Sequence, residues 1–99
     1  MIFGIDYDGT FSEDPDFFLD LITLMKAYGH QAVIVTQRSS EWDRHDVDKN
    51  VNGKIPVVFA GEKWKNVAAK EEGYDVDVWI DDSYEFNREL FLLRKSILH

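Results

Sequence analysis

The sequence of 99 residues contains no cysteine and no long run of apolar residues. Without cysteine the chain has no disulfide, no thiolate metal ligand and no thiol nucleophile. No stretch approaches the roughly 18 consecutive apolar residues of a membrane span. The amino-terminal stretch lacks the basic start and long apolar run of a signal peptide, because Asp6 and Asp8 interrupt it. We therefore expect a protein without a membrane partner, and the cytoplasm is the default compartment.

Basic residues are also few, since 11 Lys and Arg stand against 19 Asp and Glu, for a formal net charge of -8. This balance argues against nucleic-acid binding through a broad basic face, and leaves a nucleic-acid end phosphate open as a substrate. A small phosphorylated substrate also stays open, because a divalent cation can reverse the local sign of the charge. Hydrophobic residues make up 44% of the chain, so we expect one ordered domain over residues 1–99.

Apolar segments and helical patterns alternate along the chain. Strands are predicted at 1–6, 31–36, 54–60 and 75–80, and helices from Asp14 and Pro15 to Gly29, near 62–72 and at 84–98, with a short helix around 40–49 in the polar segment 37–53. Short connections between alternating strands and helices are typical of parallel βαβ units. We predict an α/β fold, a three-layer α/β/α (Rossmann-like) domain with a small, mainly parallel four-stranded sheet.

The first predicted helix has an apolar stripe and defined ends. Its apolar residues recur at i, i+3, i+4 and i+7, namely Phe18, Leu21, Ile22 and Met25. Asp14 can cap the first turn, where Pro15 is tolerated, and Gly29 can end the last turn. This pattern predicts a helix that packs one face on the sheet.

Polar residues that can do chemistry stand at or just after the carboxyl end of each predicted strand. In chain order they are Asp6 and Asp8, Thr36, Lys63 and Lys65, and Asp81 and Asp82. In a parallel α/β sheet the carboxyl ends of the strands meet at one edge, where ligands bind. We therefore expect these side chains to gather there.

Each group also has a purely structural explanation. Asp8 and Gly9 form a common turn pair, and a threonine such as Thr36 is a good strand former. The two lysines can lie on a solvated helix, and Asp82 or Ser83 can cap the helix that follows. The common placement of the groups at one edge is what favours a functional site.

Several carboxylates, a hydroxyl and an ammonium together fit phosphoryl transfer. Clustered carboxylates tolerate one another around a hard divalent cation, and Mg²⁺ prefers oxygen ligands and phosphate oxygens. A lysine suits the remaining phosphate charge. The backbone N–H groups of the turn at Gly9 and Thr10 can bind phosphate oxygens, and an aspartate can act as a nucleophile.

The order of these motifs resembles that of the haloacid dehalogenase-like (HAD) hydrolase superfamily. "IFGIDYDGTF" is similar to its first motif, an apolar strand followed by Asp-x-Asp-Gly-Thr, and "VWIDDS" to its fourth. "VIVT" is similar to the second motif, and a lysine that opens a helix to the third. The first and fourth motifs are the specific ones.

The resemblance implies a role for each matching residue. Asp6 would be the nucleophile that attacks phosphorus, and Asp8 the general acid and base. Thr36 would bind a phosphoryl oxygen. Lys65, or Lys63 in its place, would neutralise the developing charge. Mg²⁺ would be held by Asp6, the backbone carbonyl of Asp8 and Asp82, with Asp81 as an adjacent or water-mediated ligand.

The chain also departs from that family's usual pattern. Family members usually carry an inserted cap domain, but the segments 8–29 and 37–53 are too short to hold one. The resemblance thus implies a capless member with an open site, which a large substrate or a second copy in a homo-oligomer would cover. Arg38, Arg44 and His45 are candidates for substrate contact, although solvated loop residues have the same character.

We therefore expect a Mg²⁺-dependent phosphatase with a phosphorylated substrate and a phospho-aspartyl intermediate. A non-catalytic or regulatory domain of the same type, which binds metal or phosphate, is the alternative. Asp8 favours the enzyme, since a binding domain has no use for a general acid. A CheY-like phosphoacceptor domain fits the Asp-Gly-Thr turn and the late "DD" pair poorly.

Overall fold

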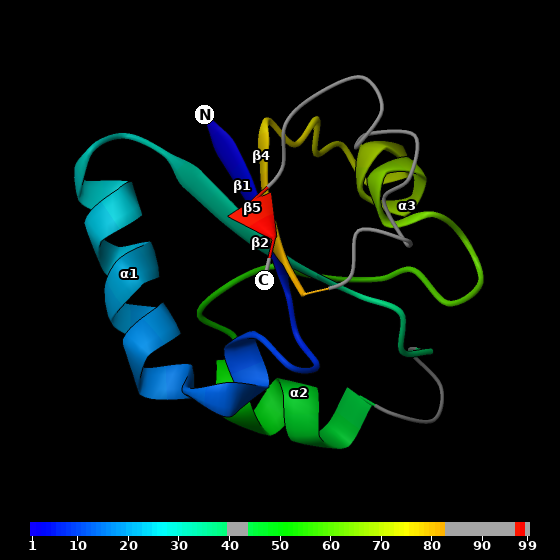
Figure 1. Ribbon diagram of the computed structural model, residues 1–99, viewed down its shortest axis with the longest axis horizontal. Helices are drawn as coiled ribbons and strands as arrows, with labels where there is room; N and C mark the ends of the chain where they lie inside the picture. The colour runs from blue at the N-terminus through cyan, green and yellow to red at the C-terminus, as the bar shows by residue number, and fades with distance from the viewer. Residues whose placement is uncertain (40–43, 83–96, 99) are drawn as a thin grey trace.

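The structure is a computed structural model that describes residues 1–39, 44–82 and 97–98 (Figure 1). The elements in chain order are β1 (Ile2–Asp6), the 3₁₀ turn η1 (Phe11–Glu13), α1 (Pro15–Ala27), β2 (Gln31–Thr36), α2 (Arg44–Val51), β3 (Val57–Phe59), α3 (Lys65–Glu71), β4 (Val78–Asp81) and β5 (Ile97–Leu98). The strands pair in the order β3-β2-β1-β4-β5, and every pair is parallel. The predicted α/β fold with a small parallel sheet of four main strands is confirmed.

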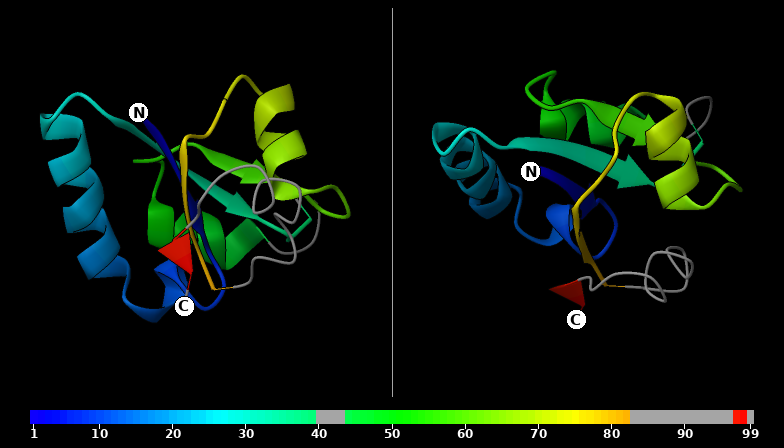
Figure 2. Two further views of the ribbon diagram at one scale, coloured as in Figure 1. Left: turned by 45° about the horizontal axis from the view of Figure 1, so that its top comes forward. Right: turned by 90° about the horizontal axis from the view of Figure 1, so that it is seen from above.

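The chain crosses the sheet in two directions. From β1 it moves outward to β2 and then to β3, and after α3 it returns past both to pair β4 with β1. Figures 1 and 2 show α1 and α3 on opposite sides of the strands. A crossover that reverses direction changes face because parallel connections are right-handed.

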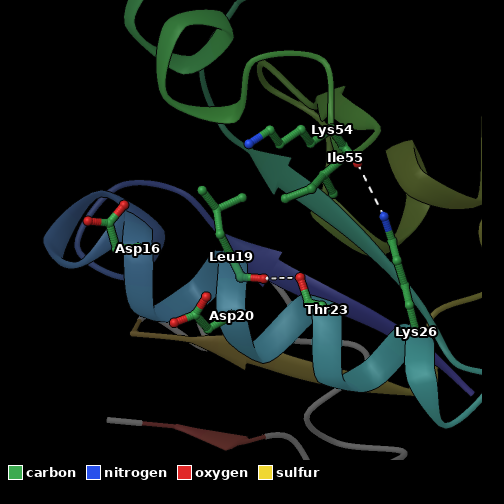
Figure 3. A pocket seen from close by; sticks show the side chains of 7 residues that line it. All are labelled: Asp16, Leu19, Asp20, Thr23, Lys26, Lys54 and Ile55. Carbon is green, nitrogen blue, oxygen red and sulfur yellow. Dashed lines mark hydrogen bonds between the residues drawn. The ribbon is translucent and has the colours of Figure 1, made fainter.

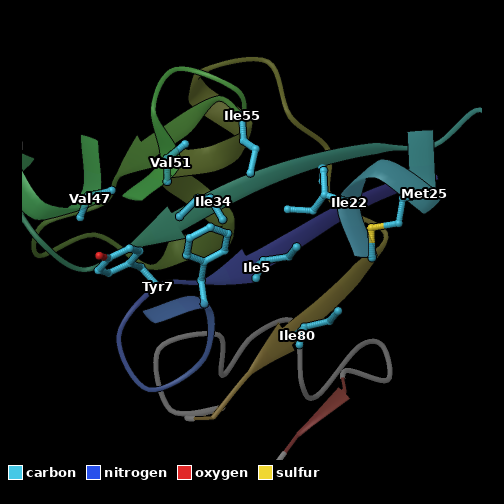
Figure 4. Close-up of a cluster of buried hydrophobic side chains, with 11 residues drawn as sticks. Ile5, Tyr7, Ile22, Met25, Ile34, Val47, Val51, Ile55 and Ile80 are labelled. Atoms are coloured by element: carbon cyan, nitrogen blue, oxygen red, sulfur yellow. The ribbon is translucent and has the colours of Figure 1, made fainter. Parts of the chain in front are cut away.

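Two hydrophobic clusters fill the two faces of the sheet. The cluster in Figure 4 joins Ile5, Ile34 and Ile80 of the sheet to α1 and α2. The second cluster joins Val33, Val35 and Trp79 to Ala68 and Ala69 of α3. Neighbouring strand residues point to opposite faces, so Ile34 and its neighbours Val33 and Val35 belong to different clusters.

The first helix has the predicted ends and the predicted buried face. The N–H of Phe17 donates to Asp14 Oδ1 at 3.2 Å, and Pro15 occupies the first turn. Gly29 follows the helix with a φ of 83°, a conformation that favours glycine. Ile22 and Met25 are buried, and Phe18 and Leu21 are partly buried against the same cluster.

Other predicted boundaries were wrong by a few residues. β3 starts only after Pro56, which has no N–H to donate to a strand ladder, although its carbonyl accepts from the N–H of Ile34 at 2.9 Å. The helix predicted near 62–72 begins at Lys65. The short helix predicted around 40–49 is α2, whose described residues begin at Arg44 and run on to Val51.

The predicted helix at 84–98 is wrong at its end, and the rest of it lies outside the described residues. Ile97 and Leu98 form β5, in register with Ile80 and Asp81. The outer edge of β4 presents backbone N–H and C=O groups that a further strand satisfies. For these two residues strand pairing therefore prevails over the helical spacing of the apolar side chains.

Gly4 allows the ring of Trp79 to lie close to the backbone of β1. A Cβ atom at Gly4 would stand 2.8 Å from two ring carbons of Trp79, which is fully buried. We expect Gly4→Ala to lower the free energy of unfolding, measured in urea, by about 1–3 kcal/mol through overpacking. In a Trp79→Leu background the same methyl group should cost much less, and an equal cost in both backgrounds would contradict this contact.

Candidate functional site

A buried ion cluster lies at the carboxyl ends of β1 and β4. Lys65 Nζ donates to Asp6 Oδ1 at 2.6 Å and to Asp81 Oδ2 at 2.8 Å. The side chains of Lys65, Asp6 and Asp81 are 2%, 6% and 1% exposed. Charged side chains are almost never buried to this extent unless they are paired. The cluster therefore holds these three side chains in one arrangement.

The sheet register explains how residues so far apart in sequence meet. Ile5 pairs with Ile80, so Asp6 and Asp81 follow as neighbours on adjacent strands. Ile5 and Ile80 face α1, and the residue after each must therefore face α3. Lys65 is the first residue of α3, which places its ammonium beside both carboxylates.

Asp82 adds a third carboxylate to this pair, next to the turn after β1. Carboxylate oxygens of Asp6, Asp81 and Asp82 lie within 4.8 Å of one another, and Asp82 is exposed. A Cβ atom at Gly9 would stand 2.2 Å from Asp82 Oδ2, and Gly9 has a φ of 79°. Only glycine both adopts this backbone conformation and leaves room for the carboxylate.

The pKa of Asp6 is shifted mainly by burial. The pKa is raised from its ordinary 3.8 to about 7, because burial disfavours the ionised carboxylate. The charge and hydrogen bond of Lys65 lower it, whereas the charge of Asp81 and a hydrogen bond to Asp82 raise it further. At Asp6 the effect of burial therefore outweighs that of Lys65.

The donor set fits a small, hard divalent cation. All three carboxylates offer oxygen, the ligand atom that Mg²⁺ prefers. A divalent cation among these oxygens would also favour the ionised form of Asp6. Asp6, Asp81 and Asp82 are the residues that could hold it, with Lys65 already bonded to one oxygen of each buried aspartate.

The two threonines predicted to serve the site are both buried. Thr10 Oγ1 donates to Asp6 Oδ2 at 3.3 Å, so this hydroxyl supports the second oxygen of Asp6. Thr36 ends β2, and its Oγ1 accepts from the N–H of Arg38 at 3.2 Å. The backbone N–H groups of Gly9 and Thr10 donate within the turn, to Ser12 Oγ and to the carbonyl of Tyr7. A phosphate oxygen bound there would have to replace these local bonds.

The two lysines of the third motif differ completely in their surroundings. Lys63 Nζ donates to the two carboxylate oxygens of Glu71 at 2.6 and 2.9 Å, and its side chain is 62% exposed. Lys65 is the one beside Asp6 and Asp81. Lys65 thus lies in the buried cluster, and Lys63 lies in a surface ion pair.

Asp8 belongs to a second, exposed cluster, with Arg38 and Asp46. Arg38 Nε and Nη2 donate to the two oxygens of Asp8 at 2.9 and 2.7 Å. Arg38 Nη1 donates to Asp46 of α2, and the guanidinium carbon lies 5.2 Å from the centre of the Tyr7 ring. Both carboxylates raise the pKa of Arg38. The carboxylate of Asp8 is therefore engaged with Arg38, whereas the three-carboxylate group consists of Asp6, Asp81 and Asp82.

Tyr7 and Asp46 are functional candidates that the sequence prediction missed. Tyr7 stands between Asp6 and Asp8 in the sequence, and its side chain is buried. Its hydroxyl donates to the Asp46 carbonyl at 3.3 Å and accepts from Asn50 Nδ2 at 2.7 Å. Burial raises the pKa of Tyr7. The sequence feature that could have indicated Tyr7 is its place between the two aspartates of "DYD". Tyr7 anchors α2 beside the turn that carries Asp8.

The other two loop candidates lie apart from the carboxylate cluster. Arg44 Nε donates to Asp48 Oδ2 at 2.8 Å, one helical turn further along α2, and its guanidinium lies over Phe59. His45 is exposed. These contacts are those of surface residues on a helix.

A pocket lies between α1 and the segment at Lys54 and Ile55, and two of its polar side chains bond to nearby backbone carbonyls (Figure 3). Lys26 Nζ donates to the carbonyl of Lys54 at 3.3 Å, and Thr23 Oγ1 donates to the carbonyl of Leu19 at 2.9 Å. None of the seven residues that line it is one of the predicted site residues. We therefore place the candidate site at the strand ends.

Comparison with known proteins yields no relative. No protein-family model matches the sequence, and neither a curated protein nor a solved structure matches it. Within residues 1–39, 44–82 and 97–98, no helix has both the length and the apolar character needed to cross a membrane. The function must therefore be argued from the chemistry of the site itself.

Lys65→Met should lower the free energy of unfolding at neutral pH by about 3–5 kcal/mol, because it removes the ammonium that pairs with both buried aspartates. The matched variant Lys63→Met breaks only a surface ion pair and should change it by less than about 1 kcal/mol. Urea unfolding of both variants in metal-free buffer measures the difference. Equal effects would mean that Lys65 is not the buried counter-ion.

The raised pKa of Asp6 predicts how stability depends on pH in metal-free buffer. The folded chain keeps this proton up to about pH 7, while an unfolded chain releases it at about pH 4. The contribution of Asp6 to stability therefore falls as the pH rises between these values. The free energy of unfolding of the parent minus that of Asp6→Asn should fall by on the order of 4 kcal/mol across this range. A difference that stays constant with pH would contradict the raised pKa.

Proposed function

We propose that this chain is a Mg²⁺-dependent phosphatase of the haloacid dehalogenase-like type, which acts through a phospho-aspartyl intermediate. The observation that carries the proposal is the buried Asp6, held by Lys65 next to Asp81 and Asp82 at the carboxyl edge of a parallel sheet. A carboxylate that is oriented by an ammonium and lies beside further oxygen ligands is suited to attack phosphorus.

The proposed fold is a three-layer, Rossmann-like α/β/α domain without a cap. Two hydrophobic clusters support it, one with α1 and α2 and the other with α3. The segment between β1 and β2 holds only η1 and α1, and α2 is the one helix of the described residues between β2 and β3. An uncapped site is open to large substrates, and a second copy of the chain could also cover it.

In the first proposed step, an oxygen of Asp6 forms a bond to phosphorus while the bond from phosphorus to the leaving oxygen breaks. Asp8 gives its proton to that oxygen, which leaves as an alcohol. In the second step water attacks phosphorus, Asp8 takes a proton of the water, and the bond to Asp6 breaks. The products are the alcohol and inorganic phosphate, and Asp6 returns to a carboxylate.

The neighbouring residues have supporting roles. Lys65 keeps one oxygen of Asp6 fixed at 2.6 Å and offers positive charge to the transferred group. Thr10 holds the other oxygen of Asp6 through its hydroxyl. Thr36 would bind a phosphoryl oxygen through the Oγ1 that now accepts from the N–H of Arg38.

Mg²⁺ fits the oxygens of Asp6, Asp81 and Asp82, and the Asp8 carbonyl would complete the set that the HAD resemblance implies. When bound, the cation would offset the negative charge of the phosphoryl group.

A binding domain without catalysis is the second candidate, and one observation favours it. The carboxylate of Asp8 accepts from Arg38 through both oxygens, so the general acid is engaged away from the three-carboxylate group. A domain that only binds metal and phosphate needs Asp6, Asp81 and Asp82 and makes no use of Asp8. The two candidates therefore differ in what a change at Asp8 does.

Hydrolysis of an aryl phosphate with Mg²⁺ tests the enzyme proposal. Asp6→Asn should lose on the order of 10⁴-fold in kcat, since the nucleophile is gone. Asp8→Asn should lose on the order of 10²- to 10⁴-fold, as expected for a general acid and base. Asp20→Asn, an exposed carboxylate change on α1, is the matched control and should keep full activity. Unchanged rates in Asp6→Asn would refute the mechanism.

Binding of fluoroberyllate with Mg²⁺ separates the two candidates further. Calorimetry should detect binding to the parent and none to Asp6→Asn, because the analogue requires the carboxylate oxygen. Binding to the parent without turnover of any phosphate ester would favour the binding domain. Absence of binding and of turnover would leave neither candidate standing.

A further inference from the structure

Arg38 contacts Asp8, Asp46 and Tyr7, and the reaction proposed above assigns no role to Arg38 itself. Its guanidinium bonds both oxygens of Asp8 and one oxygen of Asp46, and it lies on the face of Tyr7. The hydroxyl of Tyr7 in turn donates to the carbonyl of Asp46. The guanidinium of Arg38 is therefore the centre of this cluster, and it stacks on the ring of Tyr7.

The contact between Arg38 and Asp8 competes with the role proposed for Asp8. A general acid must turn an oxygen that carries a proton toward the leaving group. In this structure each oxygen of Asp8 instead accepts a hydrogen bond from the Arg38 guanidinium, at 2.9 and 2.7 Å. The pair must open before Asp8 can act.

The pair is exposed enough to be opened by a ligand. The side chains of Arg38, Asp8 and Asp46 are 26%, 55% and 51% exposed. Exposed ion pairs contribute little net stability, so an anion that takes the place of Asp8 loses little in the exchange. A guanidinium can bind either a carboxylate or a phosphate through two parallel hydrogen bonds.

We propose that Arg38 is a positioning and specificity residue, which holds Asp8 in a resting pair until a second anionic group of the substrate takes the guanidinium. This inference rests on the proposed phosphatase function. It assigns the substrate class as phosphate monoesters whose leaving group carries a further carboxylate or phosphate. Asp46 keeps Arg38 in place after Asp8 has left it.

Binding of non-hydrolysable ligands tests the anion site without turnover. With Mg²⁺ present, the parent should bind 3-phosphonopropionate about 10-fold more tightly than propylphosphonate, which has the same chain without the carboxylate. Arg38→Gln should lose this preference. Arg44→Gln removes a guanidinium of the same region that pairs with Asp48, and it should keep the preference.

Turnover tests the restraint on Asp8, with phenyl phosphate and 3-carboxyphenyl phosphate as substrates. For phenyl phosphate, Arg38→Gln should raise kcat by about 2- to 5-fold, because Asp8 is released. For 3-carboxyphenyl phosphate the same variant should lower kcat/KM about 10-fold, because the second anion has lost its partner. A merely structural role would change both substrates in the same direction and would overturn the proposal.

Asp46→Asn should strengthen the pair between Arg38 and Asp8, whereas Arg38→Gln removes it. Without Asp46 the guanidinium has one carboxylate fewer, so its pair with Asp8 should tighten and kcat for phenyl phosphate should fall. A rise in kcat, like that expected for Arg38→Gln, would contradict the proposed order of contacts.

The outcomes separate this inference from the proposed function. Turnover that depends on Asp6, without a carboxylate preference in the parent, refutes the role of Arg38 and leaves the phosphatase standing. A preference that depends on Arg38, without turnover of either ester, supports the anion site and refutes the phosphatase. If neither phosphonate binds, the anion site is refuted, and the Asp6 variant decides the phosphatase separately.

Discussion

The ammonium of Lys65 between Asp6 and Asp81 is the contact on which the site depends. It joins the first residue of α3 to the last residues of β1 and β4. The contact exists only because the chain, after β3, returns across the sheet on the opposite face and pairs β4 with β1. The topology and the buried charges thus support one another, since a lysine in this position neutralises carboxylates that the register brings together.

The two ion clusters, one around Lys65 and one around Arg38, differ in their exposure to solvent. Lys65 and its aspartates are buried, so their geometry is held firmly and solvent and salt screen their interaction little. Arg38, Asp8 and Asp46 are partly solvated, so their contacts can be exchanged at small cost. A site that must hold a nucleophile still and let an acid move would need both kinds of cluster.

Local rules predicted both ends of α1 correctly and failed for residues 97–98. The cap at Asp14 and the stop at Gly29 depend on neighbouring backbone atoms, and the structure has both. Residues 97–98 have the spacing of a helix and nevertheless form β5, because the edge of β4 lies beside them. A sequence window of a few residues contains no information about which strand edge is near.

The sequence by itself determined where the apolar strands run and that carboxylates follow the first and fourth of them, because these patterns are local. Only the tertiary structure decided that Lys65 and not Lys63 meets Asp6, and that Asp8 lies with Arg38 and Asp46. Lys63 and Lys65 are two residues apart and chemically identical. Their difference arises from the start of α3 over the sheet, which buries one ammonium and leaves the other in solvent.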